Sequence, residues 1–214
     1  MRRRVSPLLV VLVAALVAVI AVAGVIGWQF IGTNLIAQQA TAKELSAVRS
    51  SFEGASAIEG AGAAEQPVSH RAAWLLRIPR IGVEVPVIAG VEPGDLSRGV
   101  GWYPGSALPG QVGNCAIAGY RFSNGEPFRR LLELKVGDQI IIETPTAVLT
   151  YSLISAPGDL TVGRNDSWVL DPVPGRPDEV PTQAHLTLTT AEDVVDSYDI
   201  AVGFATRRWG AATR

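Results

Sequence analysis

Short runs of aliphatic and β-branched residues, separated by glycine- and proline-rich turns, fill the chain from Trp74 onward. Runs of about four to eight residues bounded in this way are typical of the strands of an all-β domain. We expect strands at residues 75–78, 83–88, 115–119, 139–143, 148–155, 184–190 and 198–205. About seven or eight short strands favour a closed barrel, because closure removes the exposed strand edges that promote aggregation.

Two segments between these strands have a different character. Residues 127–134 are predicted to form one short helix, with a proline near its first turn and leucines along one face. Residues 171–181 are rich in proline and are predicted to form a surface loop that connects the last two strands. A loop beside a barrel mouth can select a substrate, although most long loops of this composition are only solvated.

The N-terminus is apolar and uncharged from Leu8 to Ile31, and it follows Arg2, Arg3 and Arg4. At about 1.5 Å per residue, a helix of this length covers a hydrocarbon core of roughly 30 Å. A cleaved signal peptide is the alternative, but its apolar region is shorter, about 7–15 residues. Because arginines flank the short end, the positive-inside bias places residues 1–7 in the cytoplasm. We therefore expect residues 8–31 to be a single-pass anchor in the plasma membrane.

The remaining chain is predicted to lie outside the membrane. Residues 32–72 are interpreted as a linker, which is helical at 34–52 and a flexible tether at 54–66, where Gly, Ala, Ser and Glu bury little apolar area. Residues 73–206 make one domain of ordinary size, followed by a tail at 207–214.

Composition excludes several classes of function. The formal net charge is −2, and the domain has no patch rich in lysine and arginine, which argues against a nucleic-acid partner. Cys115 is the one cysteine, so no intrachain disulfide forms and a place in the core is expected. His70 and His185 have no other metal-type ligand close in sequence, and no phosphate or dinucleotide motif occurs. We expect no metal and no cofactor.

Three motifs in the first half of the domain carry a resemblance to a known family. They are LRIPRIGV at residues 76–83, GWYPGSALPG at 101–110 and GNCAIAGYR at 113–121. With the strand LTLTT at residues 186–190, they closely resemble sortases, and the class E sortases of actinobacteria in particular. The resemblance covers residues 74–205 and is more specific in its N-terminal half.

The resemblance implies a membrane-anchored cysteine transpeptidase built on an eight-stranded β-barrel. Sortases join proteins that bear a C-terminal sorting signal to amines of the cell wall or of pilins. In the family, a histidine follows the Ala-Gly pair, a cysteine follows the Thr-Thr pair, and an arginine begins the final strand. The thiolate attacks the peptide carbonyl, the histidine transfers protons to and from the amines, and the arginine stabilises the oxyanion.

All three catalytic positions are substituted in this chain. They fall on Tyr120, Ala191 and Asp199, with Tyr198 as the alternative for the last. The methyl group of Ala191 cannot form an acyl-enzyme. A tyrosine with an ordinary pKa near about 10 is a poor proton shuttle at neutral pH. Loss of one oxyanion donor typically costs about 3–4 kcal/mol, and an aspartate would in addition repel the developing charge.

Cys115 is not expected to replace the missing nucleophile. Strand alternation places Cys115, Ile117 and Gly119 on one face and Tyr120 on the other. His185 shares its parity with Ala191, but six strand residues separate them by about 20 Å.

The leading hypothesis is a catalytically degenerate sortase that binds a sorting-signal peptide or a partner sortase at the cell surface. The groove candidates are Trp102, Tyr103, Arg121 and Thr190. Two alternatives stay open: an active cysteine transpeptidase that attaches surface proteins to the cell wall, and a membrane scaffold that uses only the helix and tether. An open apolar groove near Tyr120 would favour peptide binding, whereas a filled one would favour the scaffold.

Overall fold

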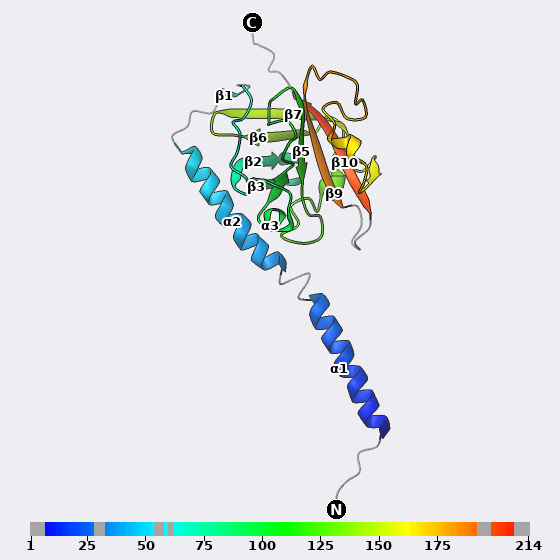
Figure 1. Ribbon diagram of the computed structural model, residues 1–214. Coiled ribbons are helices and arrows are strands. Elements are labelled where there is room, and N and C mark those ends of the chain that lie inside the picture. Colours follow the sequence, from blue (N-terminus) through cyan, green and yellow to red (C-terminus); the bar gives the residue numbers. More distant parts are fainter. Residues whose placement is uncertain (1–6, 28–32, 54–57, 60–61, 192–197, 208–214) are drawn as a thin grey trace, which may run out of the picture.

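Strands account for most of the domain in the computed structural model, which describes residues 7–27, 33–53, 58–59, 62–191 and 198–207 (Figure 1). Within these residues, ten strands pair into one continuous sheet. They are β1 (Ile58–Glu59), β2 (Ala72–Ile78), β3 (Val83–Ala89), β4 (Val100–Trp102), β5 (Gly113–Ala118), β6 (Gln139–Glu143), β7 (Ala147–Ser155), β8 (Thr161–Gly163), β9 (Ala184–Ala191) and β10 (Asp199–Arg207).

Eight of these strands close into a ring. The strand order is β1-β7-β6-β2-β3-β4-β5-β9-β10-β8, and an additional pairing joins β7 to β10. The ring therefore consists of β7, β6, β2, β3, β4, β5, β9 and β10, with β1 added to β7 and β8 added to β10. A register shift between Phe204 and Ala205 lies where β10 joins β7. The predicted eight-stranded closed β-barrel is confirmed.

Alternating side chains fill the barrel interior. On β5, Cys115 and Ile117 belong to the central hydrophobic cluster, which also contains Leu186 and Leu188 of the neighbouring β9. Cys115 is fully buried, as predicted. Ala116 is buried but lies outside this cluster, so the predicted alternation of faces along β5 is confirmed.

Three α-helices lie in the described residues, and α2 (Thr33–Phe52) packs on the outside of β2 and β3 (Figure 1). Its buried face contains Ala37 and Val48, each 3% exposed. Ion pairs join Glu44 to Arg98 and Arg49 to Glu84. The helix predicted at 34–52 is present, and it is docked on the barrel instead of standing free of it.

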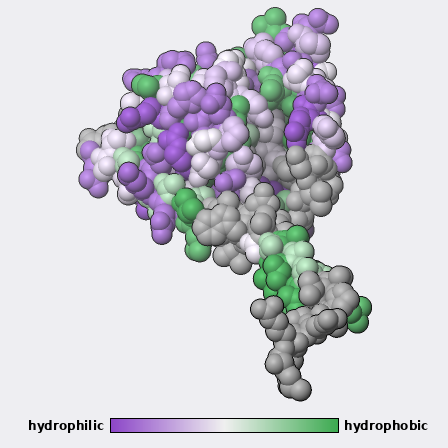
Figure 2. Space-filling view, turned by 60° about the horizontal axis from the view of Figure 1, so that its bottom comes forward, coloured by the Kyte–Doolittle hydropathy of each residue, from purple (hydrophilic) through white to green (hydrophobic). Residues whose placement is uncertain are grey.

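The N-terminal helix α1 (Pro7–Gly27) lies beyond α2, away from the barrel (Figure 1). Hydrophobic residues gather on α1, whereas the visible face of the barrel is largely hydrophilic (Figure 2). Within the part of the chain that the structure describes, no helix combines the length and the apolar character needed to cross a membrane. The anchor at residues 8–31 stays a prediction, and residues 1–6 and 28–32 lie outside the described residues.

The structure differs from the predicted flexible tether at two points. Residues 58 and 59 form β1, which pairs in parallel with β7. Ala64 is 5% exposed, and its backbone N–H donates to the Pro109 carbonyl at 2.7 Å. The other tether residues 54–57 and 60–61 lie outside the described residues.

The helix predicted at residues 127–134 is wrong. This segment forms turns and a 3₁₀ helix at Leu131–Glu133. Phe128, Leu131 and Leu134 are spaced by three residues, which matches the three residues per turn of a 3₁₀ helix, and all three are buried. Their apolar periodicity is therefore three residues, which over so short a segment resembles the 3.6-residue period of an α-helix.

The predicted connection of the proline-rich loop is also wrong. Residues 171–183 follow a 3₁₀ helix at Ser167–Leu170 and lead into β9. The last two strands, β9 and β10, are instead joined by residues 192–198. The strands predicted at 184–190 and 198–205 are β9 and β10, so a loop at 171–181 precedes both of them.

Close packing of β4 against the β3–β4 connection generates a prediction. A Cβ at Gly101 would lie 2.2 Å from the Gly90 carbonyl oxygen, which is backbone and cannot rotate away. We expect Gly101→Ala to lower the free energy of unfolding by about 1–3 kcal/mol in chemical denaturation. Gly94→Ala is the control, because a Cβ there meets no atom within 4 Å. Equal stability of the two variants would contradict this packing.

Candidate functional site

The ends of β5, β9 and β10 form one cluster on the barrel. β5 and β9 are parallel, with Ala118 paired to Thr189, and the Gly119 N–H extends the pairing by donating to the Thr189 carbonyl at 3.1 Å. β10 is antiparallel to β9, and Ile200 pairs with Ala191. Tyr120, Ala191 and Asp199 therefore lie at the same end of three neighbouring strands.

Tyr120 immediately follows this extended pairing and is half-buried. Its carbonyl accepts a hydrogen bond from the Phe128 N–H at 3.0 Å. Burial raises the pKa of the Tyr120 phenol above its ordinary value of 10.0. The hydroxyl therefore stays protonated at neutral pH and can donate a hydrogen bond, but it cannot act as a general base.

The other two positions hold an alanine and an exposed carboxylate. Ala191 is the last residue of β9, and its residue type provides no nucleophile. Asp199 is the first residue of β10 and pairs with Gly163 of β8. These strand ends therefore supply neither a nucleophile nor a cationic oxyanion donor, because the residues there are Tyr120, Ala191 and Asp199.

Hydroxyl groups hold the strand ends together. The Thr190 Oγ1 donates to the Gly119 carbonyl at 2.9 Å, and Thr190 is buried. The Tyr103 hydroxyl lies 3.4 Å from the Thr189 Oγ1. Thr189 was not among the sequence candidates, although its place in the LTLTT strand beside Thr190 could have indicated it.

The remaining groove candidates have different positions. Arg121 directly follows Tyr120, is half-buried, and stacks its guanidinium over the Phe122 ring at 4.6 Å. Trp102 is 3% exposed and lies in the barrel core, where it makes an edge-to-face contact with Trp74 at 5.7 Å. Its indole N–H donates to the Ala107 carbonyl at 3.1 Å. The prediction of Trp102 as a groove residue is wrong, because this side chain packs inside the barrel.

A family model described as the sortase domain matches residues 76–205, which is more than half of the chain. This chain belongs to the sortase family. The match includes β5, β9 and most of β10, so the cluster of strand ends lies within the sortase domain.

Curated relatives and solved structures agree with this family. The chain is 30% identical to Sortase D of Bacillus subtilis over 158 residues, which cover 71% of this chain and 75% of the relative. It is 38% identical to Sortase SrtE1 of Streptomyces coelicolor over 123 residues, which cover 54% of this chain but only 34% of the relative. Sortase E of Streptomyces avermitilis matches with a TM-score of 0.60 and 29% identity, covering 66% of this chain and 91% of that one.

A second solved structure of a relative contains a bound tripeptide. Sortase E1 of Streptomyces coelicolor, solved with a tripeptide in the active site, matches with a TM-score of 0.57 and 29% identity. This likeness covers 64% of the chain and 88% of that structure. The resemblance to class E sortases is thus confirmed by both kinds of comparison.

The single cysteine of this sortase domain faces away from the cluster. Burial raises the pKa of the Cys115 thiol far above its ordinary value. Cys115 pairs with Leu186 across the β5–β9 ladder, and its side chain lies in the barrel core. His185, at the opposite end of β9 from Ala191, lines an outer cavity of about 330 Å³ with Ile154 and Phe204. Burial lowers the pKa of His185.

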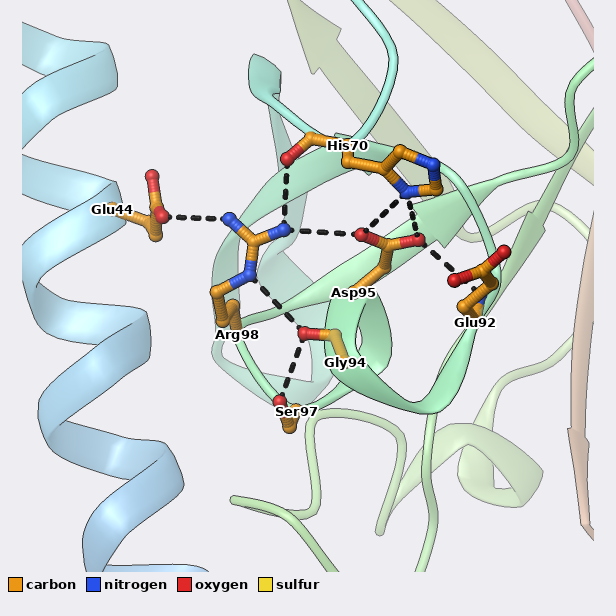
Figure 3. Close-up of polar contacts among 7 residues, drawn as sticks. All are labelled: Glu44, His70, Glu92, Gly94, Asp95, Ser97 and Arg98. Atoms are coloured by element: carbon orange, nitrogen blue, oxygen red, sulfur yellow. Dashed lines mark hydrogen bonds and ion pairs between the residues drawn. The ribbon is translucent and has the colours of Figure 1, made fainter.

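His70 belongs to a polar network that sequence reasoning missed (Figure 3). Its Nδ1 lies 2.9 Å from the Asp95 Oδ2, and the Asp95 carboxylate is only 3% exposed. Arg98 donates to the Asp95 Oδ1 at 3.0 Å and to the His70 carbonyl at 2.8 Å, and it pairs with Glu44 of α2 at 2.8 Å. The network joins α2, the segment before β2 and helix α3 (Pro93–Leu96).

His70, Glu92 and Asp95 have ligand-type atoms within 4.8 Å of one another, a spacing at which three side chains could hold a metal ion. The Asp95 oxygens already accept hydrogen bonds from Arg98 and the Glu92 N–H. Glu92 and Asp95 form a capping box at the start of α3. Since the Arg98 guanidinium supplies the positive charge beside Asp95, this arrangement is that of a structural network.

The His70–Asp95 contact predicts a pH dependence of stability. The hydrogen bond from His70 to Asp95, followed by the charge of Asp95, raises the His70 pKa above 6.5. The stabilisation is therefore complete below about pH 6.5 and is lost as the pH rises through the raised pKa of the folded state. We expect the difference in melting temperature between the wild type and His70→Gln to shrink as the pH rises.

His185→Gln is the matched control for this pH series. The pKa of His185 is lowered in the folded state, so the pH dependence of its contribution to stability is opposite to that of His70. This contribution is lost as the pH falls. A difference for His70→Gln that does not change with pH would contradict the ion pair.

Proposed function

We propose that this chain is a catalytically inactive sortase, whose barrel binds a sorting-signal peptide or a partner sortase without turnover. The observation that carries the proposal is Ala191 at the end of β9, next to the threonine pair after which sortases place their nucleophile. Without a thiolate at this position, no acyl-enzyme forms there.

The frame of a peptide groove supports the binding part of the proposal. β5 and β9 are paired in parallel up to Thr189, and the Thr190 hydroxyl bonds the Gly119 carbonyl. Tyr103 and Tyr120, both half-buried, contribute aromatic rings to this end of the barrel. Aromatic side chains with a polar tip suit peptide contacts, because they combine apolar area with hydrogen bonding. The tripeptide in the active site of the Streptomyces coelicolor relative favours the same class of ligand here.

An active transpeptidase is the second candidate, because the family and the 30% identity to Sortase D favour it. Activity would require a nucleophile other than residue 191. Cys115 is the only cysteine of the sequence, and its side chain lies in the core with a raised pKa. A thiol in this environment is protonated and out of reach of a peptide. We therefore prefer the inactive sortase.

We further propose that residues 8–31 anchor the protein in the plasma membrane, with the barrel outside and the N-terminus in the cytoplasm. The arginines at positions 2–4 support this orientation. The exposed aliphatic side chains of α1 support the contact with lipid; they are Leu8, Leu12, Val13, Leu16, Val17, Val19, Ile20 and Val22.

Turnover assays with the full-length chain test the proposed function. We expect no cleavage or ligation when the purified chain is incubated with a panel of sorting-signal peptides and an amine acceptor, with products analysed by mass spectrometry. The variant Tyr120→His/Ala191→Cys/Asp199→Arg is expected to turn over at least one peptide, because it restores the nucleophile, the proton carrier and the oxyanion donor.

The matched control carries Tyr120→His/Asp199→Arg and keeps Ala191, and it should be inert. Turnover by the unmodified chain that Cys115→Ala abolishes would contradict the proposal, since it would locate an active nucleophile at Cys115.

A further inference from the structure

The loop after Tyr120 contains a run of left-handed backbone. Asn124, Gly125 and Glu126 have φ angles of 50°, 82° and 53°. Only glycine adopts this region without a steric cost, and longer left-handed runs are disfavoured by chirality. Residues held in such conformations persist when the surrounding structure imposes them. The constraint on this loop must therefore come from its contacts.

Asn34, the second residue of α2, makes contacts with two residues of this run. Its Oδ1 accepts a hydrogen bond from the Gly125 N–H at 3.0 Å, and its Nδ2 donates to the Glu126 Oε1 at 2.8 Å. The other oxygen of Glu126 accepts from the Arg129 Nη1 at 2.6 Å. Both ends of the Asn34 amide are thus used to hold residues that lie 91 and 92 positions away in sequence.

The backbone of α2 also packs against the loop. A Cβ at Gly125 would lie 3.7 Å from the Ala37 Cβ, and Ala37 is 3% exposed. The helix is held on the barrel at two further points, by the pairs of Glu44 with Arg98 and of Arg49 with Glu84. A cavity of about 190 Å³ remains between α2 and the loop, beside Asn124 and Pro127. This space would allow the loop to relax if Asn34 released it.

The loop in turn determines the surroundings of Tyr120. It returns to the barrel at Phe128, whose N–H donates to the Tyr120 carbonyl at 3.0 Å. The fully buried Phe128 ring leaves no room for a side chain at position 119, where a Cβ would lie 2.6 Å from the ring. A change in the loop at Gly125 therefore affects Gly119 and Tyr120, the two residues that follow β5.

We propose that Asn34 is a positioning residue, through which α2 holds residues 124–126 in their left-handed conformation and sets the backbone of Tyr120 in the proposed groove. Because Asn34 lies at the end of α2 nearest α1, the groove is coupled to the N-terminal end of the protein (Figure 1). The role in peptide binding rests on the proposed function, whereas the hold on the loop does not.

Hydrogen exchange of the full-length chain tests this hold. The amides of Gly125, Glu126 and Phe128 are the reporters, since each donates one of the hydrogen bonds that shape the loop. In Asn34→Ala, we expect their exchange to accelerate by about ten-fold or more, with β6 and β9 unchanged. Gln39→Ala removes an exposed amide from the same helix and should leave the loop at the wild-type rate.

A swap of the interacting groups separates positioning from general stability. Asn34→Asp alone places two carboxylates against each other and should accelerate loop exchange. Adding Glu126→Gln restores the pairing with its direction reversed: the amide at position 126 donates to one carboxylate oxygen at position 34, and the other oxygen accepts from the Gly125 N–H. The loop should then return to within about three-fold of the wild type. Loop exchange unchanged in Asn34→Ala, equal effects of Asn34→Ala and Gln39→Ala, or no recovery in the double variant would overturn the proposal.

Peptide affinity, measured by calorimetry on the same variants with the sorting-signal panel, distinguishes this inference from the proposed function. We expect Asn34→Ala to lower the population of the ordered loop and to weaken peptide affinity by the same factor. The Asn34→Asp/Glu126→Gln variant should recover the wild-type affinity. If no peptide binds the wild type while loop exchange responds as expected, the hold by Asn34 is supported and the peptide-binding part of the proposed function fails. Peptide binding unaffected by Asn34→Ala overturns its positioning role.

Discussion

The parallel pairing of β5 with β9 is the interaction on which the rest of the structure depends. It runs from Gly113 opposite Ala184 to Ala118 opposite Thr189. In the ring it joins the strands up to β5 to the last two strands, β9 and β10. Parallel strands share the direction in which they end. This pairing therefore brings the Ala-Gly and Thr-Thr pairs of the sequence to one end of the barrel, whatever side chains follow them.

Three hydrogen bonds at this end of the barrel are made by backbone groups and a threonine hydroxyl. The Gly119 N–H donates to the Thr189 carbonyl, and the Thr190 hydroxyl donates to the Gly119 carbonyl. The Tyr120 carbonyl accepts from the Phe128 N–H. The fold can consequently keep its shape while Ala191 removes the nucleophile. A fold that is stable without its catalytic groups can be retained for binding alone, since function belongs to the site and not to the fold. On this account the chain keeps the sortase frame, and Tyr103 and Tyr120 keep it suited to a peptide.

Sequence reasoning succeeded where a signal was local. The strands β2, β3, β5, β6, β7, β9 and β10 follow clear apolar runs between turns, and the motifs identified the family. It failed for β4 and β8, because three residues carry no periodicity. Trp102 was assigned to the groove from the resemblance alone, which does not indicate that its side chain lies in the barrel core. Sequence reasoning also missed the contacts of His70 with Asp95 and of Asn34 with Gly125, because pairs 25 and 91 positions apart leave no pattern in a single sequence.

Binding without turnover is the central claim, and an NMR titration tests it most directly. The isotope-labelled full-length chain would be titrated with a sorting-signal peptide while the amides of Gly119, Tyr120 and Thr190 are followed. If the chain binds the peptide without turnover, the shifts are saturable and concentrated at these amides, and the peptide is recovered intact at the end. Cleaved peptide, or binding that leaves these amides unshifted, would contradict this claim.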